Sequence, residues 1–171
     1  MVRIIRNIVM LLLGLLAIAA AIIWWMLQQS LPVLQGVQPA ALKSAVTVSR
    51  DERGYLTIRA TNQADAVYSL GFSHAQDRFF QMDLLRRNAA GELAELFGPA
   101  ALPTDKERRI HRFRDRAELS LANLPKADQQ LLQHYTDGVN AGLNRLGMPP
   151  FEYLLLTSRP RAWQSTDSLL V

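Results

Sequence analysis

Residues 8–27, IVMLLLGLLAIAAAIIWWML, contain no charged side chain, and this stretch constrains the fold of the chain more than any other. At about 1.5 Å per residue, a helix of this length spans roughly 30 Å, the thickness of the hydrocarbon layer of a bilayer. Arg3 and Arg6 precede the stretch, and the next basic residue after it is Lys43. The positive-inside rule therefore predicts a cytoplasmic N-terminus, with the chain after residue 27 carried across the membrane.

A cleaved signal peptide is the competing interpretation of this stretch. Signal peptides have an apolar core of about 7 to 15 residues that ends at small residues. Residues 19–21 are alanines, but IIWWML follows them, and Trp24 and Trp25 suit a membrane interface. We therefore expect a single-pass inner-membrane anchor with the folded part in the periplasm. The alternative is a protein secreted to the periplasm after signal cleavage.

The charge and cysteine content exclude several classes of function. The chain has no cysteine, so disulfides, thiolate metal sites and a cysteine nucleophile are excluded. The net charge is +4, but residues 106–116, KERRIHRFRDR, hold six of the 19 lysines and arginines. Glu107 and Asp115 interrupt this run, which favours a solvated helix face over a nucleic-acid interface. We expect no nucleic-acid partner.

The chain divides into three regions. Residues 1–27 form the cytoplasmic tip and the anchor or signal, and residues 28–45, with two prolines and one glycine, look like a tether. The folded domain occupies residues 46–171. It opens with two β-branched runs, VTVSRD and YLTIRA, on either side of Arg53 and Gly54, which predict two strands joined by a tight turn. Two strands alone are marginally stable, so they need a further sheet or a helix to pack on.

Helices are predicted for most of the remaining domain. Asn62 and Asp65 resemble a capping box, and the helix that they start extends toward Gly98 and Pro99, with a break near Gly71 or Gly91. Its apolar stripe consists of Phe72, Ala75, Phe79, Met82, Leu93 and Leu96.

A second helix starts at Pro125 and ends near Gly147. Its apolar face comprises Leu131, Leu132, Tyr135, Val139 and Leu143. The predicted fold class is α+β and mostly helical.

Sequence motifs of catalysis and metal binding are absent. His74, His111 and His134 lie 37 and 23 residues apart, and no zinc or calcium motif surrounds them. The chain has no GxSxG motif and no phosphate-binding glycine loop. The sequence therefore offers no self-contained catalytic or metal site.

The run AQDRFFQMDLLRR, residues 75–87, is the most polar part of the first long helix. Asp83 precedes Arg86 and Arg87 by three and four residues, which predicts ion pairs on one helix face. Asp77, Arg78 and Gln81 can form a second polar patch, and Asp77 could act as a general acid or base only in a cleft that shifts its pKa. We interpret the run as a polar face that ties the helix to neighbouring loops.

Seven segments together carry a resemblance to a known family. They are SLPVLQG (30–36), RDERGYLTIRA (50–60), LGFSHAQDRFFQMDLLRRNAAGELAELFG (70–98), the Asp105 and Arg109 pair, YTDGVNAGL (135–143), PPFEYLLL (149–156) and RPRAWQSTDSL (159–169). The chain resembles the α-subunit region of the penicillin acylase (penicillin amidase) family of N-terminal nucleophile hydrolases. It is most similar in character to acyl-homoserine lactone acylase-like members.

The resemblance implies part of an αββα assembly and an amide hydrolase made as a precursor, which is cut into an α chain and a β chain. The N-terminal serine of the β chain would be the nucleophile, and it lies beyond Val171. The calcium ion that the resemblance implies for the full-length enzyme is bound beyond this region, and Glu152 is not its ligand. No catalytic, substrate-binding or metal-binding residue and no cofactor is therefore expected in these residues.

The resemblance assigns these residues a scaffold role instead. The scaffold motif is Asp77, Arg78, Gln81, Asp83, Arg86, Arg87, Tyr135, Gly138 and Asn140. The expected partners are the β chain of the same precursor, the membrane through residues 8–27, and an N-acyl small-molecule substrate. The last residues, Leu169, Leu170 and Val171, read as the middle of an element, so we expect a partial chain that is inactive alone. The alternative is a non-catalytic, membrane-anchored binding or assembly module.

Overall fold

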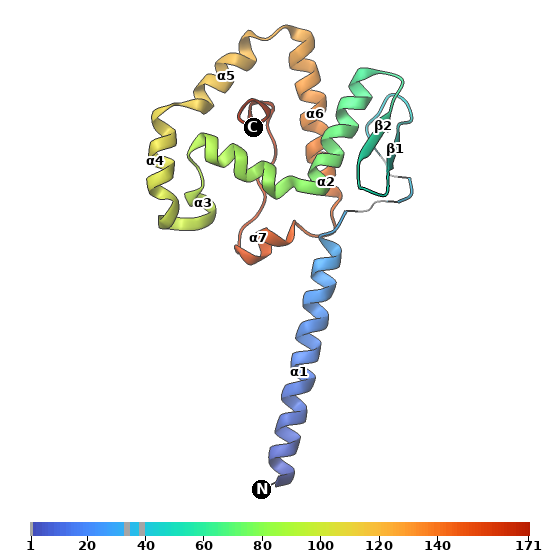
Figure 1. Cartoon of the computed structure of the whole chain (residues 1–171), viewed down its shortest axis with the longest axis vertical. Coiled ribbons are helices and arrows are strands. Elements are labelled where there is room, and N and C mark those ends of the chain that lie inside the picture. The colour runs from blue at the N-terminus through green and yellow to red at the C-terminus, as the bar shows by residue number, and fades with distance from the viewer. Residues whose placement is uncertain (1, 33–34, 38–39) are drawn as a thin grey trace.

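The computed structural model describes residues 2–32, 35–37 and 40–171. A long helix projects from a helical body that carries a small hairpin at its side (Figure 1). In chain order, the elements are α1 (Val2–Gln29), β1 (Thr47–Arg50), β2 (Leu56–Arg59), α2 (Gln63–Ala90), α3 (Ala94–Phe97), the 3-10 helix η1 (Gly98–Ala101), α4 (Leu102–Ile110), α5 (Phe113–Asn123), α6 (Lys126–Arg145), α7 (Phe151–Leu155) and the 3-10 helix η2 (Ser165–Leu169). The described chain is mostly helical with one two-stranded sheet, as the sequence predicts.

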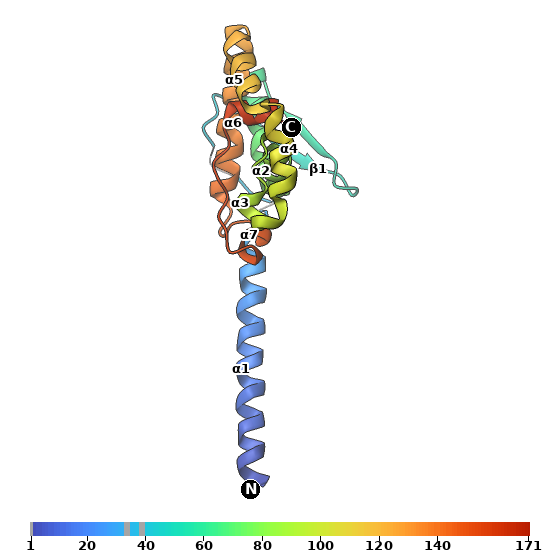
Figure 2. The ribbon, with the colours of Figure 1, turned by 90° about the vertical axis from the view of Figure 1, so that its left-hand side faces the viewer.

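Helix α1 stands away from the body in both side views (Figures 1 and 2). None of its residues is buried. It is the one helix in the described part of the chain that is long and apolar enough to cross a membrane, judged by length and composition alone. At its C-terminal end, the Gln29 carbonyl accepts a hydrogen bond from the Met148 N–H at 3.1 Å. The helix therefore contacts the folded body only where it ends.

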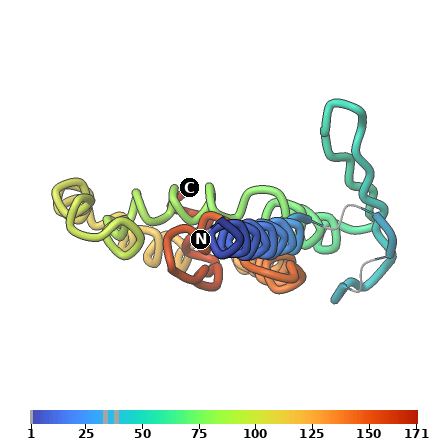
Figure 3. The backbone as a smooth tube through the Cα atoms, turned by 90° about the horizontal axis from the view of Figure 1, so that it is seen from below, coloured from blue at the N-terminus to red at the C-terminus, as the bar shows by residue number. Residues whose placement is uncertain are grey.

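The hairpin pairs β1 and β2 in antiparallel register, with Thr47 opposite Arg59. The tight turn forms where the sequence predicts it, because Gly54 has a positive φ of 85° and the Asp51 carboxylate accepts the N–H groups of Arg53 and Tyr55. Every residue of β1 is exposed. Figure 3 shows the hairpin projecting away from the helical body.

Helix α2 begins at the predicted cap and ends at Gly91, one of the two positions at which the sequence predicts a break. The Asn62 side chain caps the Asp65 N–H at 2.9 Å, although Asp65 does not return the second bond of a capping box. Its carboxylate instead accepts the N–H groups of Lys43 and Ser44, which fixes the preceding segment to the start of the helix. At the other end, Gly91 adopts the left-handed conformation, with φ 69°.

The other predicted break position, Gly71, does not interrupt the helix. The kink lies at Arg78, with φ −152° and ψ 28°, whereas Gly71 is helical. Beyond the left-handed turn at Gly91, the chain resumes as the short helix α3, which Leu93 caps and which ends at Gly98 as the sequence predicts. Glycine at position 91 decides the end of α2, since it adopts a positive φ at little steric cost.

Helices α2 and α6 pack closely against each other. A Cβ atom at Gly138 would lie 2.0 Å from the Tyr68 carbonyl oxygen, and one at Gly71 would lie 2.3 Å from the Tyr135 carbonyl oxygen. Glycine is thus required for the two backbones to approach this closely. Helix α6 ends at Arg145, within two residues of the predicted end at Gly147.

The hydrophobic core lies where α2, α6, α7 and the C-terminal segment meet. Its buried members are Ala75, Phe79, Met82, Leu96, Val139, Tyr153 and Trp163. Four of the six predicted stripe residues of the first long helix belong to this core, and Phe72 and Leu93 do not. Tyr153 and Trp163 complete it from segments outside the two predicted helices.

The basic run at residues 106–116 covers the end of α4 and the start of α5. Five of its six basic side chains are exposed, and Arg114 is half-buried. The prediction of a solvated helix face is therefore confirmed for most of the run. Asp105 and Arg109 both hold the turn after α2, since Asp105 accepts the Leu93 N–H at 2.9 Å and Arg109 donates to the Gly91 carbonyl at 2.8 Å.

Candidate functional site

A cluster of charged side chains is buried in the second half of α2. The Asp83 carboxylate accepts hydrogen bonds from Arg86 Nε at 2.6 Å and from Arg87 Nε at 2.9 Å. The Tyr153 hydroxyl, on α7, donates to the same carboxylate at 2.6 Å. The side chains of Asp83 and Arg86 are 0% exposed. The ion pairs predicted by spacing are thus formed in the interior of the protein.

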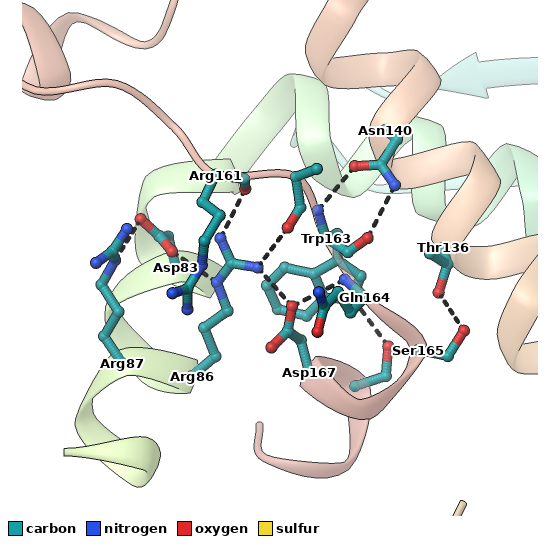
Figure 4. Close-up of polar contacts among 12 residues, drawn as sticks. Asp83, Arg86, Arg87, Thr136, Asn140, Arg161, Trp163, Gln164, Ser165 and Asp167 are labelled. Atoms are coloured by element: carbon teal, nitrogen blue, oxygen red, sulfur yellow. Dashed lines mark hydrogen bonds and ion pairs between the residues drawn. The ribbon is translucent and has the colours of Figure 1, made fainter. Parts of the chain in front are cut away.

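Arg86 connects α2 to the C-terminal segment (Figure 4). Its Nη2 donates to the Arg161 carbonyl at 2.7 Å, and its Nη1 donates to the Ala162 carbonyl at 3.0 Å and to Asp167 Oδ2 at 2.5 Å. The guanidinium carbon lies 4.9 Å from the centroid of the Trp163 ring, within cation–π range. One side chain therefore holds residues 161–167 against the core.

An outer layer of ion pairs surrounds Asp83 and Arg86. Glu92 accepts hydrogen bonds from Arg114 at 2.8 Å and from Arg161 at 2.5 Å. The complete set consists of four carboxylates (Asp83, Glu92, Glu95, Asp167) and four guanidinium groups (Arg86, Arg87, Arg114, Arg161). The charges of this set, which we call the ionic cluster, are therefore balanced.

The ionic cluster holds its central carboxylate in the charged form. Burial alone would raise the pKa of Asp83, but the Tyr153 hydrogen bond and the Arg86 and Arg87 charges outweigh it, so this pKa lies below its ordinary value. Burial and the bond to Asp83 raise the pKa of Tyr153, which stays a neutral donor. A carboxylate so stabilised is a poor proton acceptor near neutral pH.

The arrangement is suited to holding segments together. The atoms of Asp83 are saturated by Arg86, Arg87 and Tyr153, and the carboxylate is closed off from solvent, so a substrate cannot reach it. Across the described ranges, no group of three or more His, Asp or Glu side chains could hold a metal ion. The ionic cluster is therefore a structural feature of the fold.

The second predicted polar patch does not form as one unit. Asp77 turns to the hairpin, where its two carboxylate oxygens accept from Arg50 Nη2 at 2.7 and 2.6 Å. Arg78 and Gln81 are exposed, and within the described part of the chain neither side chain makes a hydrogen bond. Asp77 thus ties the hairpin to α2, and it lies apart from the ionic cluster.

Tyr135 meets a histidine at the contact between α2 and α6. Its hydroxyl lies 2.9 Å from His74 Nδ1, and the two rings are arranged edge to face. Burial, assisted by the charge of Arg78, lowers the pKa of His74, so the imidazole is neutral at pH 7. The pair links the two helices through a polar contact.

Asn140 of α6 binds the backbone of Trp163 at both ends of its amide. Asn140 Oδ1 accepts the Trp163 N–H at 2.8 Å, and Nδ2 donates to the Trp163 carbonyl at 2.9 Å. Gly138, two residues earlier on the same helix, allows the close approach to α2. Most residues of the scaffold motif therefore join segments of the chain, whereas the side chains of Arg78 and Gln81 make no hydrogen bond within the described residues. The scaffold role of the motif stays a prediction.

Sequence reasoning missed six members of the site, Tyr153, Glu92, Glu95, Arg114, Arg161 and Asp167. All of these residues lie outside the run at 75–87. Tyr153 contacts Asp83 across 70 positions of the chain, and Asp167 contacts Arg86 across 81 positions. Spacing on one helix carries no signal for such partners. The signal that could have found most of them is their place in the family motifs. PPFEYLLL and RPRAWQSTDSL contain Tyr153, Arg161 and Asp167, and the segment 70–98 contains Glu92 and Glu95, whereas Arg114 lies in none of the motifs.

A separate cleft of about 660 Å³ lies between β1, the preceding segment and the start of α2. Its apolar lining includes Leu42, Val46, Val48, Tyr68 and Phe72. Histidines and carboxylates are absent from the lining of this cleft. The described lining combines these apolar side chains with the basic groups of Lys43 and Arg50.

Fold and site together define a helical framework, in which the buried ionic cluster holds α2 against the C-terminal segment. The chain belongs to the penicillin amidase family, because residues 45–171 match the model of the family described as penicillin amidase.

Curated relatives agree with this assignment. The chain is 38% identical over 146 residues to the penicillin acylase 2 proenzyme of Pseudomonas sp. (strain SE83), covering 85% of this chain and 19% of that protein. It is also 38% identical over 144 residues to the acyl-homoserine lactone acylase QuiP of Pseudomonas aeruginosa, covering 83% of this chain and 17% of that protein. The chain thus spans less than a fifth of the length of these relatives.

A solved structure has the same fold. The thermostable penicillin G acylase from Alcaligenes faecalis superposes with a TM-score of 0.66 at 30% identity, covering 74% of this chain and 69% of that chain. The helical framework and the hairpin therefore belong to an architecture that is found in an acylase.

Proposed function

We propose that this chain is the N-terminal part of an exported amide hydrolase that cleaves the acyl-amide bond of an N-acyl substrate, such as an acyl-homoserine lactone or a penicillin. The observation that carries the proposal is the similarity to two acylases, of which one is named for penicillin and the other for acyl-homoserine lactones. Both classes of substrate contain an acyl group joined to nitrogen. The shared reaction is thus hydrolysis of that amide.

The proposal divides the work between two parts of one precursor. The described residues provide the framework, and the nucleophile comes from a β chain that begins with serine. An α-amino group has a pKa near 8 and can accept the serine proton without a histidine. The ionic cluster supports this division, because its carboxylates are occupied by arginine and tyrosine donors.

Anchoring in the inner membrane is the second part of the proposal. Residues 8–27 are free of charge and α1 is exposed along its whole length, as expected of a helix surrounded by lipid. The positive-inside rule supports this orientation, because Arg3 and Arg6 precede the apolar stretch and favour a cytoplasmic N-terminus with the body in the periplasm. Secretion after signal cleavage is the alternative.

The calcium ion that the family resemblance implies for the full-length enzyme is proposed to lie among residues beyond this region. In the part of the chain that the structure describes, three metal-binding side chains do not come together at any point. Glu152, on α7, belongs to no such group of side chains among the described residues.

The test is to sequence and express the native locus on both sides of residue 171. We expect a glycine-serine or similar junction followed by a large β region, and a processed product that releases free amine from an N-acyl homoserine lactone or a phenylacetyl amide. Amine release, measured with a fluorogenic amine reagent, separates amide hydrolysis from lactone opening.

Two controls accompany this test. Replacing the junction serine by alanine should abolish amine release, and residues 1–171 alone should release none. A locus without a β region, or a processed complex that binds both substrates and hydrolyses neither, would favour the non-catalytic binding or assembly module.

A further inference from the structure

The point at which α1 joins the folded body fixes how close that body lies to the end of the helix. The Met148 N–H donates to the Gln29 carbonyl at 3.1 Å. The Gln29 side chain also covers Gly147, since a Cβ atom there would lie 2.6 Å from Gln29 Oε1. Ser30, directly after the helix, is buried. The body therefore begins at the last residue of α1.

This junction sets the depth of the neighbouring residues if α1 spans a bilayer. The apolar stretch ends at residue 27, where Gln28 follows, and Gln29 lies two residues further, which is about 3 Å along a helix. The headgroup layer on each side of the hydrocarbon is roughly 5–7 Å thick. Gly147 and Met148, which contact Gln29, therefore lie within the headgroup layer.

Helix α7 begins three residues after Met148 and lies at the same end of the body. Figures 1 and 2 both place it beside the end of α1, at the base of the body. Phe151 is 42% exposed and Leu155 is 78% exposed. Because they are four residues apart, the two apolar side chains project from the same face of the helix.

The opposite face of α7 is fixed to the core. Tyr153, between the two exposed residues, is fully buried and donates to Asp83. The Ser158 N–H also donates to the Tyr153 carbonyl at 2.9 Å, which closes the end of the helix. Helix α7 therefore presents Phe151 and Leu155 outward in a fixed orientation.

We propose that the Phe151 and Leu155 face of α7 inserts into the interfacial layer of the same bilayer that α1 crosses. This inference rests on the proposed anchoring of α1. The lipid surface is the partner that the geometry favours, because the apolar face lies beside the end of α1, at the level of Gln29. On α1, Gln29 is only four residues beyond Trp25 and five beyond Trp24. Amphipathic tryptophan rings locate that level at the membrane interface. The exposed Arg159, just beyond α7, suits anionic headgroups.

Two contacts would then hold the body at a set angle to the membrane. Helix α1 alone provides one point of attachment, about which the body could rotate. A second attachment at α7 removes this rotation, so the hairpin and the cleft beside β1 keep a constant height above the lipid.

The absence of cysteine from the sequence allows single-site labelling of the full chain. Leu155→Cys carries an environment-sensitive fluorophore in vesicles of phosphatidylethanolamine and phosphatidylglycerol, and Phe151→Cys gives a second position on the same face. Brominated lipids quench a label in the bilayer, and iodide quenches a label in water. Leu119→Cys on α5 is the matched control, since Leu119 is 65% exposed and α5 lies at the far end of the body (Figures 1 and 2).

A third label, at Ile22→Cys in α1, tests the anchoring itself. We expect brominated lipid to quench the labels at positions 22, 151 and 155 at least twofold more than the label at position 119, and iodide to quench mainly the label at position 119. A label at position 22 that lipid does not quench would overturn the anchoring and the inference together.

Two other results would overturn the inference while leaving the anchoring intact. In the first, lipid quenches the label at position 22, while iodide quenches the label at position 155. In the second, the label at position 155 is protected from both quenchers, which would mean that a second copy or further polypeptide covers α7.

Discussion

Tyr153 donates its hydroxyl hydrogen to Asp83 at 2.6 Å, although the two residues are 70 positions apart in the chain. The bond joins α7 to α2 inside the core, where both side chains are shielded from water. A neutral donor of high pKa thus stabilises a carboxylate of low pKa. The stability of the framework depends on this contact.

Replacing Tyr153 by phenylalanine should therefore destabilise the full chain in detergent micelles. The ring stays in the core while the hydrogen bond to a charged group is lost, which costs about 1.5–3 kcal/mol. Urea denaturation followed by pulse proteolysis measures the change. Tyr55→Phe is the matched control, because Tyr55 is exposed in the hairpin turn. Equal midpoints for the two variants would contradict the prediction.

Asp83→Asn should have a larger effect. The variant leaves the buried Arg86 and Arg87 without their shared carboxylate, and breaking a buried pair in this way costs about 3–5 kcal/mol. Asp115→Asn breaks the exposed pair with Arg112 and should cost no more than about 1 kcal/mol. The yield of folded protein and its urea midpoint are the measurements. A loss at position 115 as large as that at position 83 would show that burial of the pair is unimportant.

Acid should unfold the chain through the same carboxylate. In the unfolded chain Asp83 takes up a proton near pH 4, whereas in the folded protein its pKa lies lower. The stabilisation is therefore present above about pH 4 and is lost as the pH falls through the folded pKa. Glu92, whose pKa is lowered by its Arg161 and Arg114 partners against the effect of burial, acts in the same direction.

The urea midpoint between pH 5 and pH 3 measures this loss. His74 has a lowered pKa and contributes its own loss below about pH 6.5, so the comparison is made in a His74→Gln background. Adding Tyr153→Phe should make the acid dependence shallower, because it removes one cause of the low pKa of Asp83. A midpoint that is independent of pH over this range would refute the assignment.

Gly138→Ala should separate α2 from α6. The new methyl group would lie 2.0 Å from the backbone oxygen of Tyr68, which cannot move without shifting α2. Overpacking of this kind costs about 1–3 kcal/mol. Gly14→Ala in α1 is the control, because nothing lies within 4 Å of its added Cβ. Thermal melting of the two variants should differ by several degrees, and coincident curves would contradict the prediction.

The parts of the fold that follow from neighbouring residues could be predicted from the sequence. Asn62 caps α2, and Gly54 turns the hairpin, because each acts on backbone groups within a few positions. Asp83 meets Arg86 and Arg87 because helical spacing brings them to one face. Such features depend on local geometry alone.

Other parts could not be predicted, because distant segments determine them. The burial of Asp83 depends on α7 and on residues 161–167, which return to α2 only in the folded protein. The kink of α2 falls at Arg78, where no proline or glycine signals it. Asp77 also turned out to bond with Arg50 of the hairpin, 27 positions away.

The glycines between α2 and α6 also affect how the sequence can change over time. Gly71, Gly138 and Gly142 each face backbone atoms of the opposite helix, so main-chain atoms set the closest contact between the helices. Exchanges of the flanking side chains do not alter that contact. The outward faces of both helices can therefore diverge widely while the crossing is inherited unchanged.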